Sequence, residues 1–207
     1  LGLDFEPNPP VMISEFNYGS DEFVELYNQS GVAIDLEGFT ITDEEEVDIG
    51  GEGAVMFPAA ASIASADVVV VASNATDYAT AYTGAPAADY EITDSGTVPD
   101  MLPNAGWATG SVTLSNGGDQ ILLVDQFSTV IDVATYEGDL YPGVTDHPGS
   151  STNTDTFERR QPAIDTNDCS VDFTTHALVD ATPGEVWLSL GSLGDFCTDG
   201  SHCISGF

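Results

Sequence analysis

Short alternating segments, separated by turn residues, dominate this chain of 207 residues, and helical periodicity is nearly absent. In a strand, successive side chains point to opposite faces, and the segment 22–28 alternates in this way. Turn residues recur roughly every 8 to 15 positions, a spacing typical of all-β sandwiches and barrels. About nine strands and two long loops, at 83–110 and 137–155, therefore predict an antiparallel β-sandwich formed by a single domain.

The clearest strands are runs rich in β-branched and aromatic residues. They are expected at 11–16, 22–28, 67–73, 120–125 and 130–136. An Asn-Gly pair at 116–117 predicts a hairpin that joins a strand at 111–114 to the strand that follows the pair. The segment 77–82 is the one expected helical turn, with Asn74 or Thr76 as its cap.

The charge balance is the second constraint. The chain has 35 Asp and Glu residues against 2 Lys and Arg, a formal net charge of −33, and both cations are arginines. Nucleic-acid binding and docking on anionic lipid depend on basic side chains, so the composition argues against both kinds of partner. The hydrophobic fraction of 42% supplies a core, so a folded surface carries the charge. Acids spread along the chain favour adaptation to saline water, and a surface that collects cations is the alternative.

Cysteine spacing and two sequons bear on the cellular location. The spacing fits no zinc ribbon, and one disulfide is expected between Cys197 and Cys203, with Cys169 as the alternative partner. A disulfide and an acidic, lysine-free surface suit an exported protein, so we expect an extracellular or cell-surface location. Asn28 and Asn74 begin acceptor sequons and are candidate glycosylation sites. No apolar run reaches about 18 residues, so membrane insertion is not expected.

A series of segments, taken in order, resembles the lamin tail domain family in its exported prokaryotic type. The segments are VMISEF (11–16), EFVELYN (22–28), IDLEGFTITD (34–43), VVVA (69–72), LSNGGDQILL (114–123), VIDVATY (130–136), FERR (157–160) and ATPG (181–184). The resemblance covers residues 10–184 and implies an immunoglobulin-like β-sandwich that serves as a binding or architectural module, without family-wide catalytic residues. It leaves an N-terminal extension at 1–9 and a C-terminal extension at 185–207 that contains a cysteine-rich start.

Catalytic templates are absent from the sequence. It contains no Gly-x-Ser-x-Gly elbow, no His-Glu-x-x-His, no phosphate-binding glycine loop with its lysine and no Cys-x-x-Cys. Asp146 and His147 are adjacent, but Pro148 follows in a long loop, so a solvent-exposed imidazole is expected at His147. We therefore predict that the chain is not an enzyme.

Calcium is the one cofactor that the sequence suggests, because calcium binds about six to eight oxygens supplied by a loop. The candidate ligands alternate within one polar segment and are Asp165, Asn167, Asp168 and Asp172. The alternative is a turn in which these side chains cap their own backbone. The acidic run at 43–48 is the second candidate site, and a solvated loop is its alternative.

Arg159 and Arg160 are the two fixed positive charges of the chain. The planar fork of an arginine clamps a carboxylate in two places, and the surrounding charge is strongly negative. At least one of the pair should therefore form a partly buried structural ion pair with a strand carboxylate, Glu22 or Glu25. Capture of a ligand is the minority alternative for these arginines.

The favoured function is a non-enzymatic structural or binding module outside the cell. It is expected to associate with itself through edge strands, or through a tail strand at 185–190, and to build filaments or a surface layer with calcium as a stabilising ion. An edge strand within the same molecule is the alternative role of the tail. An accessory domain of a secreted hydrolase, such as a nuclease, is the alternative function.

Overall fold

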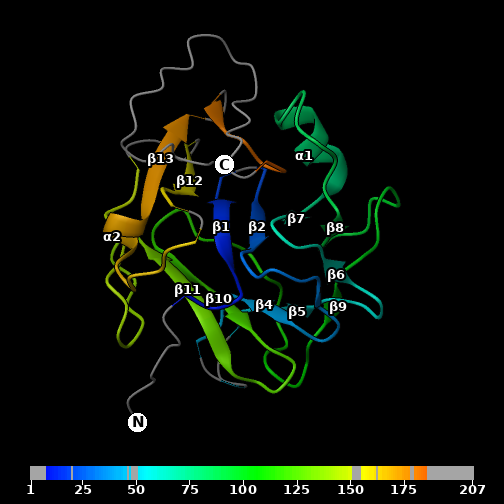
Figure 1. Ribbon diagram of the computed structural model, residues 1–207, viewed down its shortest axis with the longest axis horizontal. Helices are drawn as coiled ribbons and strands as arrows, with labels where there is room; N and C mark the ends of the chain where they lie inside the picture. Colours follow the sequence, from blue (N-terminus) through cyan, green and yellow to red (C-terminus); the bar gives the residue numbers. More distant parts are fainter. Residues whose placement is uncertain are drawn as a thin grey trace.

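The computed structural model describes residues 8–19, 21–45, 47, 51–150, 155–161, 163–177 and 180–185. Two sheets pack face to face around a principal core (Figure 1). This arrangement confirms the immunoglobulin-like β-sandwich expected from the sequence. Neither helix in this part of the chain is long or apolar enough to cross a membrane.

The first sheet has six strands in the order β13-β12-β1-β2-β7-β8, and neighbouring strands are antiparallel except for the parallel pair β7 and β8. Its strands are β1 (Val11–Asn17), β2 (Phe23–Asn28), β7 (Val68–Ala72), β8 (Tyr90–Glu91), β12 (Asp155–Arg159) and β13 (Phe173–Ala177). The strands predicted at 11–16, 22–28 and 67–73 are confirmed here as β1, β2 and β7.

The second sheet has five strands in the order β11-β10-β4-β5-β9. Its strands are β4 (Thr40–Thr42), β5 (Ala54–Met56), β9 (Leu102–Pro103), β10 (Asp119–Val124) and β11 (Val130–Tyr136), while β3 (Ile34–Asp35) and β6 (Ser62–Ile63) form a separate pair. The helices are α1 (Ala75–Ala81) and α2 (Cys169–Asp172). The predicted helical turn is confirmed as α1, because Asn74 Oδ1 accepts from the N–H groups of Thr76 and Asp77.

An aromatic cluster joins the two sheets. Phe16 on β1 stacks on Phe157 of β12 at a centroid distance of 4.9 Å, and Tyr18 stacks on Tyr136 of β11 at 4.4 Å. Each of the four side chains is at most 1% exposed. Because β11 belongs to the second sheet, these stacked rings hold one side of the sandwich closed.

The hairpin predicted at the Asn-Gly pair is wrong. Residues 111–114 form no strand, and two carboxylates bind N–H groups that a strand ladder would use. Asp43 Oδ2 accepts from the Thr113 N–H at 2.8 Å, and Asp119 Oδ2 accepts from the Ser115 N–H at 2.7 Å. The strand β10 pairs instead with β4 and β11.

The solvent exposure predicted for His147 is also wrong. His147 is 7% exposed, and its ring meets Phe157 edge to face at a centroid distance of 4.9 Å. The segment that carries it runs along β11, where the His147 N–H donates to the Thr135 carbonyl at 2.9 Å. This pairing fixes the loop that carries His147 against β11.

Ion pairs and a hydrogen bond of Arg159 also join the two sheets on the same side of the sandwich. Its side chain is 1% exposed, and its Nη2 lies 3.1 Å from Asp132 Oδ2 on β11. Its Nη1 lies 3.4 Å from Asp165 Oδ1 and 3.5 Å from Asp172 Oδ2. Its Nε donates to the carbonyl of Ile13 on β1 at 2.8 Å. One cation thus connects three strands with the segment that precedes β13.

The structure places a buried arginine beside a strand carboxylate, but that carboxylate is neither Glu22 nor Glu25, so the two predicted partners are corrected. Side chains alternate along β12, so Arg159 and Glu158 point to opposite faces of the sheet. Glu15 pairs in register with Glu158 on one side and with Glu25 on the other. The carboxylate of Glu25 therefore lies on the face that Arg159 does not reach.

Replacing Arg159 with Met should lower the free energy of unfolding by about 3–5 kcal/mol, because three buried carboxylates lose their cation. Arg160 is the matched control: it is exposed, its Nε donates to the Phe173 carbonyl, and Arg160→Met removes the same charge. The control should lose no more than about 1 kcal/mol. Urea unfolding at constant salt measures both variants, and equal losses would contradict the role given to Arg159.

Candidate functional site

The segment with the predicted calcium ligands packs on Arg159. Asp165 and Asp172 direct carboxylate oxygens at the guanidinium. Asp172 also accepts from the N–H of Thr166 at 2.9 Å and from its hydroxyl at 2.8 Å. Two of the four predicted ligands are therefore engaged with a cation that the chain itself supplies.

Of the other two predicted ligands, Asp168 accepts from the backbone of the same segment, and Asn167 contributes its own backbone N–H. Asp168 is the N-cap of α2 and accepts from the N–H of Ser170 at 3.1 Å. Asn167 has a φ of 58°, and its N–H donates to Asp165 Oδ1 at 3.0 Å. These contacts are the capping arrangement that was the alternative to calcium, and calcium binding at this segment stays a prediction.

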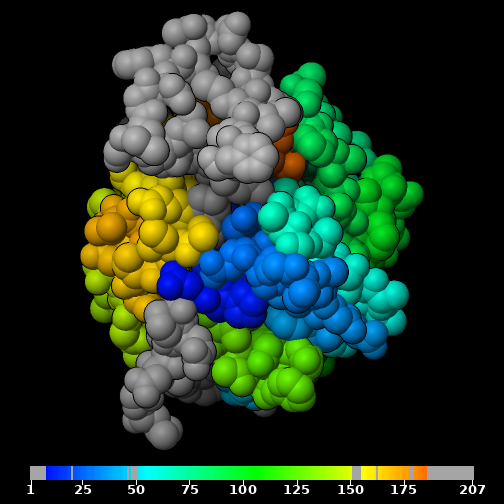
Figure 2. All heavy atoms as spheres, viewed as in Figure 1, coloured from blue at the N-terminus to red at the C-terminus, as the bar shows by residue number. Residues whose placement is uncertain are grey.

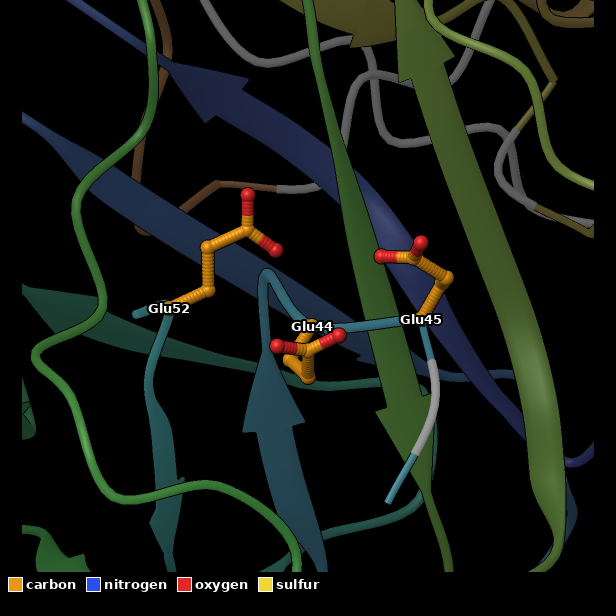
Figure 3. A group of neighbouring side chains, drawn as sticks. All are labelled: Glu44, Glu45 and Glu52. Carbon is orange, nitrogen blue, oxygen red and sulfur yellow. The ribbon is translucent and has the colours of Figure 1, made fainter. Parts of the chain in front are cut away.

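Two other groups of carboxylates in the described part of the chain lie close enough to hold a metal ion. They are Glu44, Glu45 and Glu52, and Glu91, Asp94 and Asp100. Within each group, one oxygen per residue lies within 4.8 Å of the others. The first group draws two members from the acidic run at 43–48, whose residues 46 and 48 lie outside the described residues (Figure 3).

The two groups differ in the hydrogen bonds that their buried carboxylate accepts. Glu91 Oε2 accepts from the Ala75 N–H at 3.0 Å and Oε1 accepts from the Ser95 N–H at 2.9 Å. Burial raises the pKa of Glu91, but hydrogen bonds to its charged form outweigh this and hold that pKa below its usual value. By contrast, Glu44 Oε2 has no hydrogen-bond partner among the described residues. Burial and the neighbouring carboxylates raise the pKa of Glu52 to about 7.

A row of buried glutamates crosses the face of the first sheet opposite the principal core. Glu25, Glu15 and Glu158 lie side by side on β2, β1 and β12, and each is at most 4% exposed. Figure 2 shows the β1 and β2 segments (blue) beside the β12 and β13 segments (yellow to orange). Burial, with repulsion from neighbouring glutamates, raises the pKa of Glu15 to about 9 and of Glu25 to about 8. Burial raises the pKa of Glu158 to about 7.

Cys169 occupies a core position. It is free, and its Sγ accepts from the Thr135 N–H at 3.4 Å. Burial raises the pKa of its thiol to about 12, so it is not an ionised nucleophile at neutral pH. The predicted disulfide partners Cys197 and Cys203 lie outside the described residues.

The structure corrects Asn28 as a glycosylation site. The residue is fully buried, and its Nδ2, the atom that would carry the glycan, is engaged. This nitrogen donates to the carbonyl oxygens of Val32, Ile63 and Ala64. Asn74 is half-buried at the start of α1, and its sequon stays a prediction.

Sequence reasoning missed two carboxylates that matter in the fold. Asp132 is the charged residue within the apolar run VIDVATY, and a charge inside a strand pattern is a signal of a buried partner. Glu52 follows two glycines after the acidic run, and nothing in its spacing indicates that the chain returns to Glu44. Only the pairing of β4 with β5 brings these two glutamates together.

Raising the pH from about 5 to about 9 should lower the free energy of unfolding. The raised pKa values of the glutamate row mean that the folded chain keeps protons that the unfolded chain releases near the usual glutamate pKa of about 4.3. The stabilisation that these protonated glutamates give the folded chain is therefore complete below that pH. It is lost as the pH rises through the pKa values of Glu158, Glu25 and Glu15, at about 7, 8 and 9.

Glu15→Gln keeps the neutral shape of the protonated side chain and should make this pH dependence shallower by up to about 1.4 kcal/mol per pH unit. Urea unfolding across the pH range measures the slope. Glu37→Gln, at an exposed position outside the row, is the control. If the free energy of unfolding depends on pH as steeply in Glu15→Gln as in Glu37→Gln, the row is not protonated.

The comparisons with known proteins agree with the fold. The lamin tail domain family matches residues 6–138, and the later segments at 157–160 and 181–184 lie beyond that match. Curated proteins give no match. A solved structure of a DUF4876 family protein from Bacteroides thetaiotaomicron is similar in fold, with a TM-score of 0.58 and 15% identity, over 80% of this chain and 70% of that one. Because the family match covers more than half of the sequence, the chain belongs to the lamin tail domain family.

Proposed function

We propose that the chain is a non-enzymatic structural module, exported to the cell surface or beyond, that associates with copies of itself by strand addition. The observation that carries this proposal is the edge of the first sheet at β13. This strand reads Phe-Thr-Thr-His-Ala and has no carboxylate, in a chain with 35 acidic residues. Membership of a family of β-domain modules supports the same role.

The backbone of β13 presents the N–H of Thr175 at this edge, whereas the N–H of Phe173 donates to the Cys169 carbonyl. Just before the strand, the N–H of Arg160 donates to the Asp172 carbonyl at 2.7 Å. Backbone groups alternate along antiparallel strands, so Thr174 and His176 face β12 and the Thr175 N–H faces the opposite side. None of the described strands lies on that side. A strand from a second copy can pair there without bringing carboxylates into contact.

The other sheet edges are less suited to strand addition. β8 and β9 have two residues each, and β9 contains Pro103, which lacks an N–H. β11 is already covered, because the Thr135 carbonyl accepts from His147 and the Thr135 N–H donates to Cys169. On β13, the outward-facing groups of Phe173 are engaged with the Cys169 carbonyl and Arg160 Nε, so Thr175 is the position in this strand at which strand addition is proposed.

Salt and cations govern this association. A net charge of −33 keeps copies apart at low ionic strength. Molar salt shortens the Debye length to about 3 Å and removes most of this repulsion. The module is therefore expected to assemble in saline surroundings, and calcium would strengthen assembly wherever it bridges or neutralises carboxylates.

Thr175→Pro should abolish assembly in about 3 M NaCl, because it removes an N–H at the open edge and leaves the bonds between β12 and β13 intact. Sedimentation velocity and electron microscopy measure the assemblies of the native chain and the variant. The melting temperature reports whether the variant keeps its fold.

Thr175→Ala is the matched control, since it shortens the same side chain and keeps the N–H. This control should assemble like the native chain. Monomers of the native chain at every salt concentration would refute the proposal, and so would full assembly of Thr175→Pro.

A further inference from the structure

Three carboxylates meet where β4 ends and β5 begins. Glu44 and Glu45 follow β4, and Glu52 precedes β5. Figure 3 shows their carboxylates turned toward one another, and one oxygen of each lies within 4.8 Å of the others. Gln120 on β10 reaches the same place, because its Nε2 donates to Glu45 Oε2 at 3.0 Å. Four oxygen-bearing side chains from three strand ends thus converge.

Two buried oxygens at this place lack hydrogen-bond partners among the described residues. Glu44 is 3% exposed and its Oε2 is unpaired, and Gln120 is 4% exposed and its Oε1 is unpaired. Leaving a buried polar atom unpaired costs about 1–3 kcal/mol. A rotation of the Gln120 amide by half a turn directs Oε1 at the carboxylates. A bound cation would satisfy both orphan oxygens.

The backbone around the carboxylates is held in place. The Trp107 Nε1 donates to the Glu44 carbonyl at 2.9 Å, and the Gly110 N–H donates to the Glu52 carbonyl at 2.9 Å. A Cβ at Gly110 would collide with the carbonyl oxygens of Gly51 and Glu52, so only glycine permits this close passage. The backbone positions of Glu44 and Glu52 are therefore fixed by the chain itself.

Neither lysine nor arginine supplies a cation to this place. It contains no lysine, and Arg159 and Arg160 are engaged at β1, β11 and β13. Asp43, the next carboxylate along the chain, is buried and accepts from the N–H groups of Gly53 and Thr113. Asp43 is thus satisfied by the backbone, and compensation for the three glutamates has to come from solution.

We propose that Glu44, Glu45 and Glu52, together with Gln120, bind one calcium ion. Carboxylate and amide oxygens are hard ligands that suit calcium and magnesium rather than zinc. Calcium tolerates irregular coordination and takes carboxylates in one- or two-oxygen modes, whereas magnesium requires a near-ideal octahedron. Glu45 and Glu52 are exposed, so the ion enters from solvent and water completes its shell.

The second carboxylate group shows why proximity alone is insufficient. Glu91, Asp94 and Asp100 lie equally close together. Both oxygens of the buried Glu91 already accept backbone N–H bonds, so the buried member of this group has no orphan oxygen for an ion to satisfy. It serves as an internal comparison for the proposed site.

Isothermal titration of the full chain with CaCl₂ tests the proposal. The native chain should bind one equivalent saturably, and Glu44→Gln and Glu52→Gln should each weaken binding by about tenfold or more. Asp94→Asn removes a carboxylate from the comparison group and should leave the affinity unchanged. Glu44 is buried, so Glu44→Gln can lower the stability of the fold. Glu52 is exposed, so Glu52→Gln tests the same site without that complication.

Terbium luminescence supplies a local readout, since Tb³⁺ replaces Ca²⁺ at oxygen sites and Trp107 contacts the Glu44 carbonyl. Sensitised emission should appear in the native chain, should be displaced by calcium, and should be lost in Trp107→Phe. Magnesium titrated in the same way should compete weakly.

Two results would overturn the site. In the first, Glu44→Gln and Glu52→Gln still bind calcium saturably but Asp168→Asn does not. That result would place the ion at the segment 165–172. The other is weak, non-saturating uptake that is the same in the native chain and in both glutamate variants. The carboxylates lie at the ends of β4 and β5 in the second sheet, whereas β13 is the edge of the first sheet. If strand addition is correct, Glu44→Gln should therefore still assemble in high salt. A failure of calcium binding would then leave the proposal on strand addition standing, and the reverse also holds.

Discussion

The buried guanidinium of Arg159 is the interaction on which the rest of the sandwich depends. It connects β12 of the first sheet with Asp132 on β11 of the second, and its Nε binds the backbone of β1. The carboxylates of Asp165 and Asp172 complete its surroundings, and this contact fixes the segment that leads into β13. The strand edge proposed for assembly is therefore positioned by the one cation that the chain buries.

Arg159 reaches Asp132, Asp165 and Asp172, and the remaining buried carboxylates are stabilised in other ways. In the row that contains Glu15, burial raises the pKa values of all three members, and repulsion between the glutamates adds to this for Glu15 and Glu25, so the neutral form is favoured. Asp43 and Glu91 remain satisfied by backbone N–H groups. Glu44 belongs to neither class, and its unpaired oxygen is the reason to place an external ion beside it.

Much of the fold follows from local sequence. The strands at 11–16 and 22–28 are correct because alternation and β-branched residues are local signals. The hairpin at 116–117 fails because the carboxylates of Asp43 and Asp119 replace a strand ladder, and the contact of Asp43 with Thr113 joins residues distant in sequence. The contact of Glu45 with Gln120 also joins residues distant in sequence, since it requires β4 to pair with β10.

These contacts describe a fold whose charge is only partly compensated from within, so mobile cations should complete its stability. The most direct test is the free energy of unfolding of the native chain by urea at neutral pH, as NaCl rises from about 0.1 M to about 3 M. We expect a steep rise in this free energy at low salt, followed by a plateau once repulsion among the surface carboxylates is screened. A free energy that stays constant or falls over this range would contradict a fold whose charge is compensated by mobile cations.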